Sequence, residues 1–144
     1  MKQEYKDWFI GNRDTEQEAY SWSDRSYKFT NIEISRVPFH KELRDYIYSF
    51  PNIDTEATYD MYHIHTWEEG DFFYEHIDSR YSRKWAFISE LQPSDCNTKL
   101  MVEGKEFEEG VIGCFDLHGL PKIQRGTRIS LTVFGSTKHK HLLL

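Results

Sequence analysis

The sequence is poor in the residues that build disulfide frameworks, linkers and repeats. Its 144 residues include only 2 cysteines, 8 glycines and 4 prolines. Cys96 and Cys114 match no metal-ligand spacing and would make a thin disulfide framework, so we interpret both as reduced thiols. The glycines and prolines stand at plausible turns, and the sequence contains no internal repeat. Length and pattern together predict one domain over residues 1–144.

Long apolar segments and an excess of positive charge are also lacking. The longest run without charged or polar side chains, Gly110 to Phe115, has six residues, and the opening residues MKQEYKDWF lack the apolar core of a signal peptide. The formal net charge is −6, with 24 acidic and 18 basic side chains spread along the chain. We therefore expect a cytoplasmic protein whose main partner is neither a membrane nor a nucleic acid. No sequence feature indicates an oligomeric state.

Aromatic residues are abundant and supply the missing apolar surface. Only 38% of the residues are hydrophobic, but 16% are aromatic, with 10 Phe, 9 Tyr and 4 Trp. Because each aromatic side chain buries a large area, this composition is typical of a folded chain rather than a disordered one.

The first part of the chain predicts one strand and one helix. Residues 1–26 show scattered aromatics without a clean period, so we expect a short strand or irregular structure there. Apolar residues between Tyr27 and Ile34 predict a strand. Pro38 can open a helix that Pro51 ends, with apolar residues near helical spacing at Phe39, Leu43, Ile47 and Phe50.

The remainder predicts a mainly β fold. Short aromatic and β-branched runs, separated by turn residues, occur at 57–67, 71–78, 84–91, 99–102, 111–116, 119–123 and 127–134. Such spacing after an early helix favours a double-sheet jelly roll with one or more N-terminal helices packed outside. We expect an N-terminal support region over about 1–56, a β core over about 57–135 and a C-terminal tail over 136–144.

Three side chains form a candidate metal site. His76 and Asp78 are two residues apart, so on a strand both side chains project from one face. His118 directly follows another predicted strand. Two imidazoles and one carboxylate make up the facial triad of non-haem iron(II), which leaves positions open for a co-substrate and dioxygen.

Arg128 is the candidate anion-binding residue. Strand alternation places Arg128, Ser130 and Thr132 on one face, with Ile129 and neighbouring apolar residues on the other. An arginine facing the interior needs an anion, and a guanidinium binds a carboxylate in a bidentate manner. Beside an iron site, this predicts a dicarboxylic co-substrate, to which the Ser130 hydroxyl can donate a further hydrogen bond.

The sequence resembles the Fe(II)- and 2-oxoglutarate-dependent oxygenases, and among them the prolyl 4-hydroxylase-like branch. The resemblance covers residues 60–135 and rests on three motifs in the family's order. The first motif is a series of aromatic residues and a glycine that ends in His, any residue and Asp. The second is an Arg followed by an apolar strand that ends in Leu. The third is a His followed ten residues later by an Arg, with a Gly shortly before that Arg. The matching residues are Trp67, Gly70, Phe73, His76 and Asp78; Arg83, Ala86, Phe87, Ile88 and Leu91; and His118, Gly126 and Arg128.

The resemblance implies a fold, a reaction and a set of roles. The family fold is a double-stranded β-helix, a jelly roll, and the family activity couples oxidative decarboxylation of 2-oxoglutarate to hydroxylation of an unactivated carbon. It implies iron(II) on His76, Asp78 and His118 as the catalytic metal ligands, and 2-oxoglutarate on the metal and on Arg128. It further implies dioxygen as a co-substrate and ascorbate as a reductant. By analogy, the substrate is proline or another residue in a peptide or protein, or a free amino acid. We further expect Ser130 and Trp67 beside the co-substrate, and Arg80, Tyr81 and Arg83 in a substrate-binding loop.

The chain departs from the family pattern at three places. Trp67 stands where a tyrosine is usual and has no hydroxyl for the co-substrate. Glu90 stands where a tyrosine often reaches the co-substrate carboxylate, so either Glu90 points outward or the site is altered. The residues from Asn97 to Lys99 replace the paired glycines that usually precede the next strand.

The sequence also allows two other functions. His63, His65 and Glu69 partly match the first motif of the cupins, another jelly-roll metal family, although the second cupin motif is missing around His118. The simpler role of His63 and His65 is to line or flank the barrel on the strand face that carries Trp67. A non-catalytic jelly-roll binding module, with Glu90 blocking the co-substrate, is the second alternative.

Overall fold

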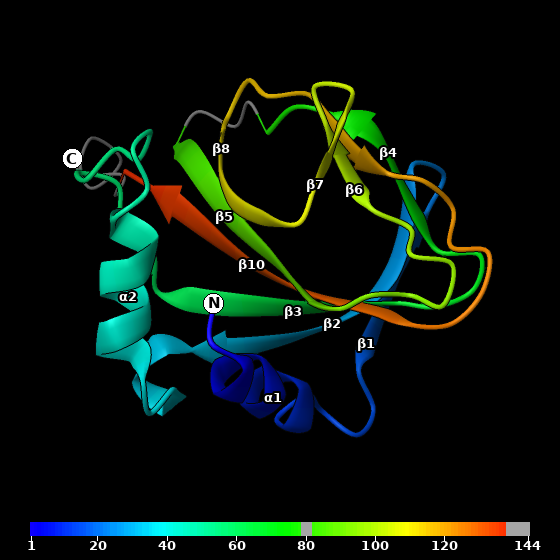
Figure 1. The fold of residues 1–144 in the computed structure, drawn as a ribbon, viewed down its shortest axis with the longest axis horizontal. Coiled ribbons are helices and arrows are strands. Elements are labelled where there is room, and N and C mark those ends of the chain that lie inside the picture. The colour runs from blue at the N-terminus through cyan, green and yellow to red at the C-terminus, as the bar shows by residue number, and fades with distance from the viewer. Residues whose placement is uncertain (79–81, 138–144) are drawn as a thin grey trace.

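The computed structural model describes residues 1–78 and 82–137, which fold into a curved antiparallel sheet with helices on one side (Figure 1). One short helix begins the chain, and two more lie in the connection between β2 and β3. The helices are α1 (Gln3–Gly11), the 3-10 helix η1 (Ile34–Arg36) and α2 (His40–Tyr48). The strands are β1 (Glu18–Trp22), β2 (Arg25–Glu33), β3 (Met61–Trp67), β4 (Phe72–His76), β5 (Arg83–Gln92), β6 (Leu100–Val102), β7 (Lys105–Phe107), β8 (Glu109–Gly113), β9 (His118–Leu120) and β10 (Arg128–Ser136).

The strand order produces the jelly roll that the sequence predicts. Along the sheet it runs β7-β6-β9-β4-β2-β3-β10-β5-β8, and β1 pairs with β2 outside this path. β2 joins the two halves, because Arg25 and Ser26 pair with β4 while Lys28 to Glu33 pair with β3. The sheet curls at this strand into a nearly closed barrel (Figure 1), so the mainly β, jelly-roll fold class is confirmed.

The helices cover the outer face of the half of the sheet that contains β2, β3, β10, β5 and β8. Residues that alternate along the strands, such as Ile64 on β3 and Leu131 on β10, form one apolar core with Phe9 of α1 and Ile47 of α2. All four side chains are fully buried. This packing explains why α2 follows the predicted helical spacing, because its stripe of apolar residues faces the sheet.

The N-terminal helix is the main error in the predicted elements. The sequence predicts a short strand or irregular structure for residues 1–26, which β1 and the irregular residues 12–17 match and α1 does not. α1 buries a single residue, Phe9, so it shows no apolar stripe that periodicity can detect. Its aromatic residues instead pack on Phe39, with the Tyr5 ring stacked at a centroid separation of 4.0 Å and the Trp8 ring edge-on at 5.5 Å. β7 was missed for a related reason, since it is a short, charged hairpin strand.

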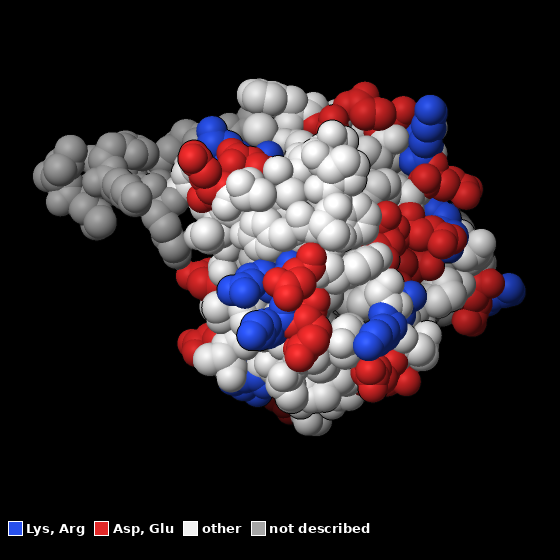
Figure 2. Space-filling view, turned by 60° about the vertical axis from the view of Figure 1, so that its left-hand side comes forward, with Lys and Arg blue, Asp and Glu red and all other residues white. Residues whose placement is uncertain are grey.

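The opposite faces of the same strands look into the barrel. His65 and Trp67 on β3 alternate with the core residues, and so do Arg128 and Ser130 on β10. This alternation matches the predicted face of β10 and collects polar side chains in the interior. On the molecular face shown in Figure 2, acidic and basic side chains of the described residues lie next to one another. No helix within the described residues is long and apolar enough to cross a bilayer.

Candidate metal centre

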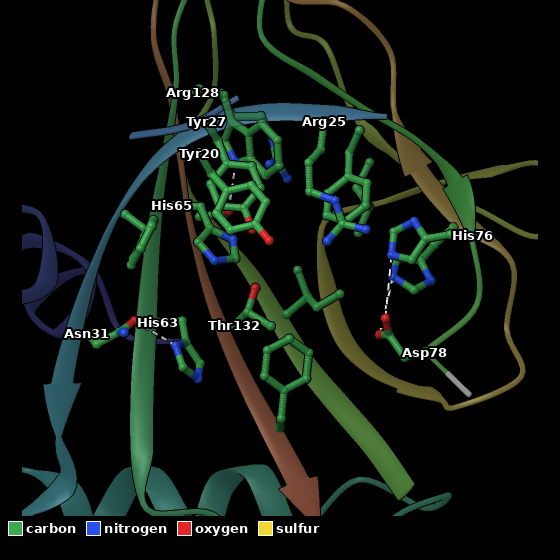
Figure 3. A pocket seen from close by; sticks show the side chains of 18 of the residues that line it. Tyr20, Arg25, Tyr27, Asn31, His63, His65, His76, Asp78, Arg128 and Thr132 are labelled. Carbon is green, nitrogen blue, oxygen red and sulfur yellow. Dashed lines mark hydrogen bonds and ion pairs between the residues drawn. The ribbon is translucent and has the colours of Figure 1, made fainter. Parts of the chain in front are cut away.

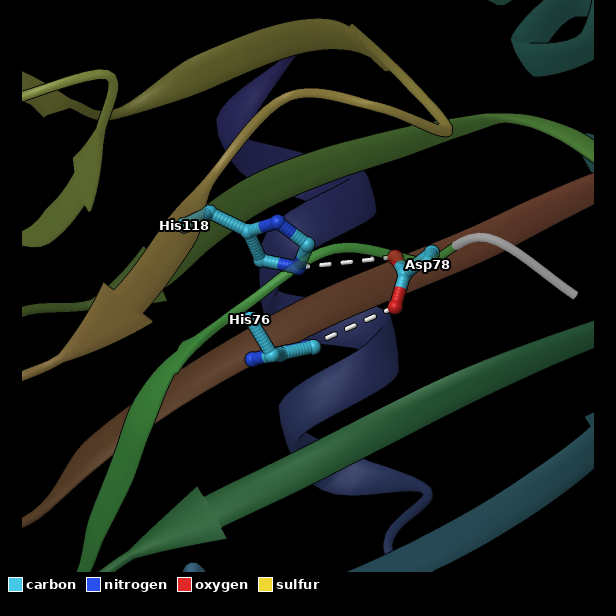
Figure 4. Close-up of side chains that lie close together, drawn as sticks. All are labelled: His76, Asp78 and His118. Carbon is cyan, nitrogen blue, oxygen red and sulfur yellow. Dashed lines mark ion pairs between the residues drawn. The ribbon is translucent and has the colours of Figure 1, made fainter.

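His76, Asp78 and His118 come together at one side of the barrel interior. His76 ends β4, His118 begins β9, and the two residues are directly paired across these strands. Nε2 of His76 lies 3.4 Å from Oδ1 of Asp78, and Nε2 of His118 lies 3.4 Å from Oδ2 of the same carboxylate (Figure 4). One ligand atom from each residue lies within 4.8 Å of the other two. Ligands about 2.1 Å from one ion at right angles are roughly 3 Å apart, so this spacing suits a single metal ion.

Backbone carbonyls orient both imidazoles. Nδ1 of His76 is 2.8 Å from the carbonyl oxygen of Tyr74, and Nδ1 of His118 is 2.9 Å from that of Asp116. A carbonyl oxygen only accepts, so each Nδ1 carries the ring proton and each Nε2 presents its lone pair toward Asp78. Such hydrogen bonds to the far ring nitrogen are the usual support of a metal-binding histidine.

The protonation states of the cluster also suit a cation. Burial lowers the pKa of His118, which keeps the ring neutral. Burial alone would raise the pKa of Asp78, but its neighbours His76, His118 and Arg83 hold it below its ordinary value. The site therefore offers a neutral imidazole at His118 and an ionised carboxylate at Asp78, with a second imidazole from His76.

Gly119 allows the two histidine-bearing strands to approach each other. A Cβ at this position would lie 2.8 Å from the carbonyl oxygen of Phe73 and 2.9 Å from the backbone nitrogen of Glu75. Both contacts are with β4 backbone, which cannot rotate away as a side chain would. The close packing of β9 on β4 thus depends on a residue without a side chain.

A cavity of about 280 Å³ adjoins the triad. Figure 3 shows His76 and Asp78 on one side of it and Arg128 and His65 on the other. The walls between them are mainly aromatic and include Tyr27. The candidate metal ligands and the candidate anion-binding arginine therefore face one shared space, as a ligand that touches both would require.

Arg128 is nearly inaccessible to solvent but is only partly satisfied. The residue is 1% exposed. Its Nε donates to Oε2 of Glu90 at 3.3 Å, while its Nη2 is buried and has no hydrogen-bond partner among the described residues. An unpartnered buried N–H group of a guanidinium needs an acceptor, and a carboxylate is the acceptor that fits it best. Glu90 is buried and faces Arg128, so it does not point outward.

Ser130 and Trp67 are linked beside Arg128. The indole Nε1–H of Trp67 donates to Oγ of Ser130 at 3.1 Å, and both residues are buried. Because Oγ accepts from the indole, the hydroxyl proton of Ser130 remains available to a ligand in the cavity. Trp67 lacks the usual tyrosine hydroxyl, but it supplies an orienting donor in its place.

The predicted substrate loop is described only at its end. Arg83 lines the cavity, with its guanidinium stacked 3.6 Å from the centroid of the Phe134 ring and Nη1 3.6 Å from Oδ1 of Asp78. Arg80 and Tyr81 lie outside the described residues. Only Arg83 is therefore placed beside the cavity.

The cupin-type ligand set does not assemble. Within residues 1–78 and 82–137, the one group of three or more potential metal-ligating side chains is His76, Asp78 and His118. Glu69 is exposed, while His63 and His65 line the cavity. Nδ1 of His63 is 2.7 Å from Oδ1 of Asn31. Burial lowers the pKa of His63 to about 4 and that of His65 to about 3, so both rings are neutral at neutral pH.

Sequence reasoning missed cavity-lining residues such as Arg25 and Tyr27. It also missed Lys99, which contacts Glu90. Its Nζ lies 2.8 Å from Oε1 of Glu90 and 2.8 Å from Oε1 of Glu108. Once Glu90 is assigned to the interior, a buried carboxylate requires a cation, and that requirement is the signal that points to a nearby lysine. Cys96 and Cys114, read as reduced thiols, are indeed unpaired.

Comparisons with known proteins agree with the fold. No family model and no curated protein matches this sequence. Among solved structures, a prolyl-4-hydroxylase from Pseudomonas putida aligns with a TM-score of 0.70 at 16% identity, covering 96% of this chain and 89% of that one. A prolyl hydroxylase from Trichoplax adhaerens, solved with a hypoxia inducible factor peptide fragment, aligns with a TM-score of 0.63 at 16% identity, covering 98% and 78%. A 2OG-Fe(II) oxygenase family protein from Burkholderia pseudomallei aligns with a TM-score of 0.59 at 15% identity, covering 85% and 73%. The chain therefore has the fold of these oxygenases and prolyl hydroxylases.

Proposed function

We propose that this protein is an iron(II)- and 2-oxoglutarate-dependent dioxygenase of the prolyl 4-hydroxylase-like branch. The observation that carries the proposal is the shared cavity. It has a His-Asp-His cluster on one side and, on another, Nη2 of Arg128, which has no hydrogen-bond partner among the described residues. The fold shared with solved 2-oxoglutarate oxygenases supports the same assignment.

The donor set fits iron(II). His76 and His118 offer Nε2 lone pairs, and Asp78 offers an ionised carboxylate, which together form a facial set for non-haem iron. When bound, the metal supplies oxidative chemistry with dioxygen, in which 2-oxoglutarate is decarboxylated and a substrate carbon is hydroxylated. Within the described residues, three side chains would hold the metal, which would leave other coordination positions open.

The remaining residues bind and orient. Arg128 holds the distal carboxylate of 2-oxoglutarate through Nη2, and Ser130 donates its hydroxyl proton to the same carboxylate. Aromatic side chains, including Tyr27 and Phe73, limit water in the cavity. Ascorbate serves as a reductant for the metal in this proposal, and the protein works in the cytoplasm.

The substrate is proline or another residue in a peptide or protein. The chain shares its fold with a prolyl hydroxylase that was solved with a peptide. Arg83 lines the cavity, and we propose that it contacts the substrate together with Arg80 and Tyr81. A free amino acid is the smaller alternative, and stimulation of succinate release by a panel of peptides and amino acids distinguishes the two.

The test measures bound iron and 2-oxoglutarate consumption for the wild type, His76→Ala and Arg128→Ala. We expect His76→Ala to lose iron and Arg128→Ala to keep iron but bind 2-oxoglutarate weakly. Wild-type protein that binds iron without consuming 2-oxoglutarate would indicate the binding module instead. Unchanged 2-oxoglutarate affinity in Arg128→Ala would show that the co-substrate assignment is wrong.

A further inference from the structure

Four side chains of alternating charge form a line from the cavity to the surface. Arg128 donates to Glu90, Glu90 accepts from Lys99, and Lys99 also reaches Glu108, with N···O distances of 3.3, 2.8 and 2.8 Å. The exposed fraction of the side chains is 2% for Arg128, 8% for Glu90 and Lys99, and 70% for Glu108. The first three charges are therefore buried, and only the fourth is in solvent.

Glu90 leaves the ligand-binding part of Arg128 available. The carboxylate accepts from Nε, whereas Nη2 stays buried without a partner among the described residues. Arg128 lines the cavity, and neither Glu90 nor Lys99 does. Glu90 thus acts on a cavity ligand through its charge and through Arg128, without touching the ligand.

The charges buried around Arg128 set how strongly this end of the cavity attracts an anion; Arg25, Arg83 and Asp78 line other parts of the cavity. Arg128 and Glu90 alone sum to zero, and such a pair offers little to a second carboxylate. Lys99 brings the buried group to +1, while solvent screens the exposed charge of Glu108. Burial would lower the pKa of Lys99, but its hydrogen bonds to Glu108 and Glu90 raise it overall, so the ammonium stays charged.

The chain delivers Lys99 through an unusual turn. Asn97 adopts a left-handed conformation with φ of 54°, and the backbone N–H of Thr98 donates to Oγ of Ser94 at 3.0 Å. This turn stands where the family usually has paired glycines, and Lys99 directly after it contacts Glu90. The two departures from the family pattern, at Glu90 and at residues 97–99, are therefore parts of one structural feature.

We propose that Glu90 and Lys99 set the charge of the co-substrate site, with Lys99 offsetting Glu90 so that Arg128 remains attractive to the distal carboxylate of a dicarboxylic 2-oxo acid. The inference rests on the proposed function and deepens it. Neither residue touches the co-substrate, so both are positioning residues that act through Arg128.

The test is a titration of 2-oxoglutarate into the full chain by calorimetry, with manganese(II) in place of iron(II) to prevent turnover. Lys99→Met leaves a buried sum of zero, and we expect its dissociation constant to rise about tenfold. Glu90→Gln leaves a sum of +2 and should bind 2-oxoglutarate several-fold more tightly. The double variant returns the sum to +1, so its affinity should return to within about threefold of the wild type.

Two controls separate charge from misfolding. Glu108→Gln removes only the exposed charge and should change the affinity by less than about threefold. 2-Oxobutanoate lacks the distal carboxylate, so its affinity should not differ among the variants. If Lys99→Met does not fold, Glu90→Gln still carries the test, because glutamine keeps the size of Glu90 and an acceptor oxygen for Arg128 and Lys99. The double variant replaces the buried pair together, which is tolerated better than removing Lys99 alone.

The outcomes that overturn the inference differ from those that overturn the proposed function. If Lys99→Met binds like the wild type, or Glu90→Gln binds more weakly than the wild type, the charge-setting role is wrong. If the wild type itself binds manganese(II) but not 2-oxoglutarate, the proposed function fails instead.

Discussion

His76 and His118 lie directly opposite each other on β4 and β9, with their ring centroids 4.2 Å apart. The register of these two strands therefore sets the position of both imidazoles. A slip of one residue would turn one ring to the other face of the sheet. Asp78 completes the cluster because the chain continues past the end of β4 toward both rings (Figure 4).

Replacing His76 with Ala should abolish tight metal binding. We expect the dissociation constant for manganese(II), measured by calorimetry, to rise on the order of 100-fold or more, because one of three ligands is lost. His63→Ala is the matched control, since His63 lines the same cavity outside the cluster. Its metal affinity should stay within about threefold of the wild type. Loss of metal binding in His63→Ala but not in His76→Ala would favour cupin-type ligation.

Gly119→Ala should weaken the metal site by separating its strands. The new Cβ would meet the Phe73 carbonyl oxygen at 2.8 Å, so β9 must shift from β4. We expect a loss of about 1–3 kcal/mol in the free energy of unfolding, measured with urea, and weaker manganese(II) binding. Gly113→Ala is the control, because its Cβ would meet only Oδ2 of Asp116, at 3.6 Å. Equal effects of the two substitutions would argue against a special role for the β4–β9 contact.

Trp67→Phe should weaken co-substrate binding without removing a direct contact. The substitution deletes the donor that orients Ser130, so we expect the affinity for 2-oxoglutarate to fall about three- to tenfold. Ser130→Ala should have a similar effect. Because both act through one hydrogen bond, the double variant should be no worse than the weaker single variant. Additive losses would show that Trp67 acts independently of Ser130.

The two cavity histidines of β3 should make the metal-free protein sensitive to acid. Burial lowers the pKa of His65 to about 3 and that of His63 to about 4, whereas both rings titrate near 6.5 when unfolded. As the pH falls, these two histidines therefore bind protons in the unfolded chain at a higher pH than in the folded protein. The stabilisation from keeping these rings neutral is complete above about pH 6.5 and is lost progressively toward pH 4.

His65→Gln removes one of the two groups that bind a proton in the unfolded chain but not in the folded protein. The slope of the free energy of unfolding against pH should decrease by up to about 1.4 kcal/mol per pH unit between pH 6 and 4.5, as measured by urea unfolding with a chelator present. Between pH 7 and 8 the slopes of variant and wild type should agree. An unchanged slope in the acid range would mean that His65 titrates normally in the folded state.

Much of the fold followed from local patterns. The helix after Pro38 and the seven predicted strand runs each correspond to an observed element, because burial on one face imposes a period that the sequence displays. α1 did not follow, since it buries only Phe9 and is held by aromatic contacts with Phe39, which lies far along the chain. Such tertiary packing leaves no periodic signal.

The sequence by itself determined which side chains share a face of a strand. The two-residue period of β structure puts Ser130 with Arg128, whatever the rest of the fold. Only the tertiary structure decided that His118 meets His76 and that Glu90 is matched by Lys99. These contacts depend on strand register and on a turn that brings distant residues together, and in a barrel both are set by the packing of all strands at once.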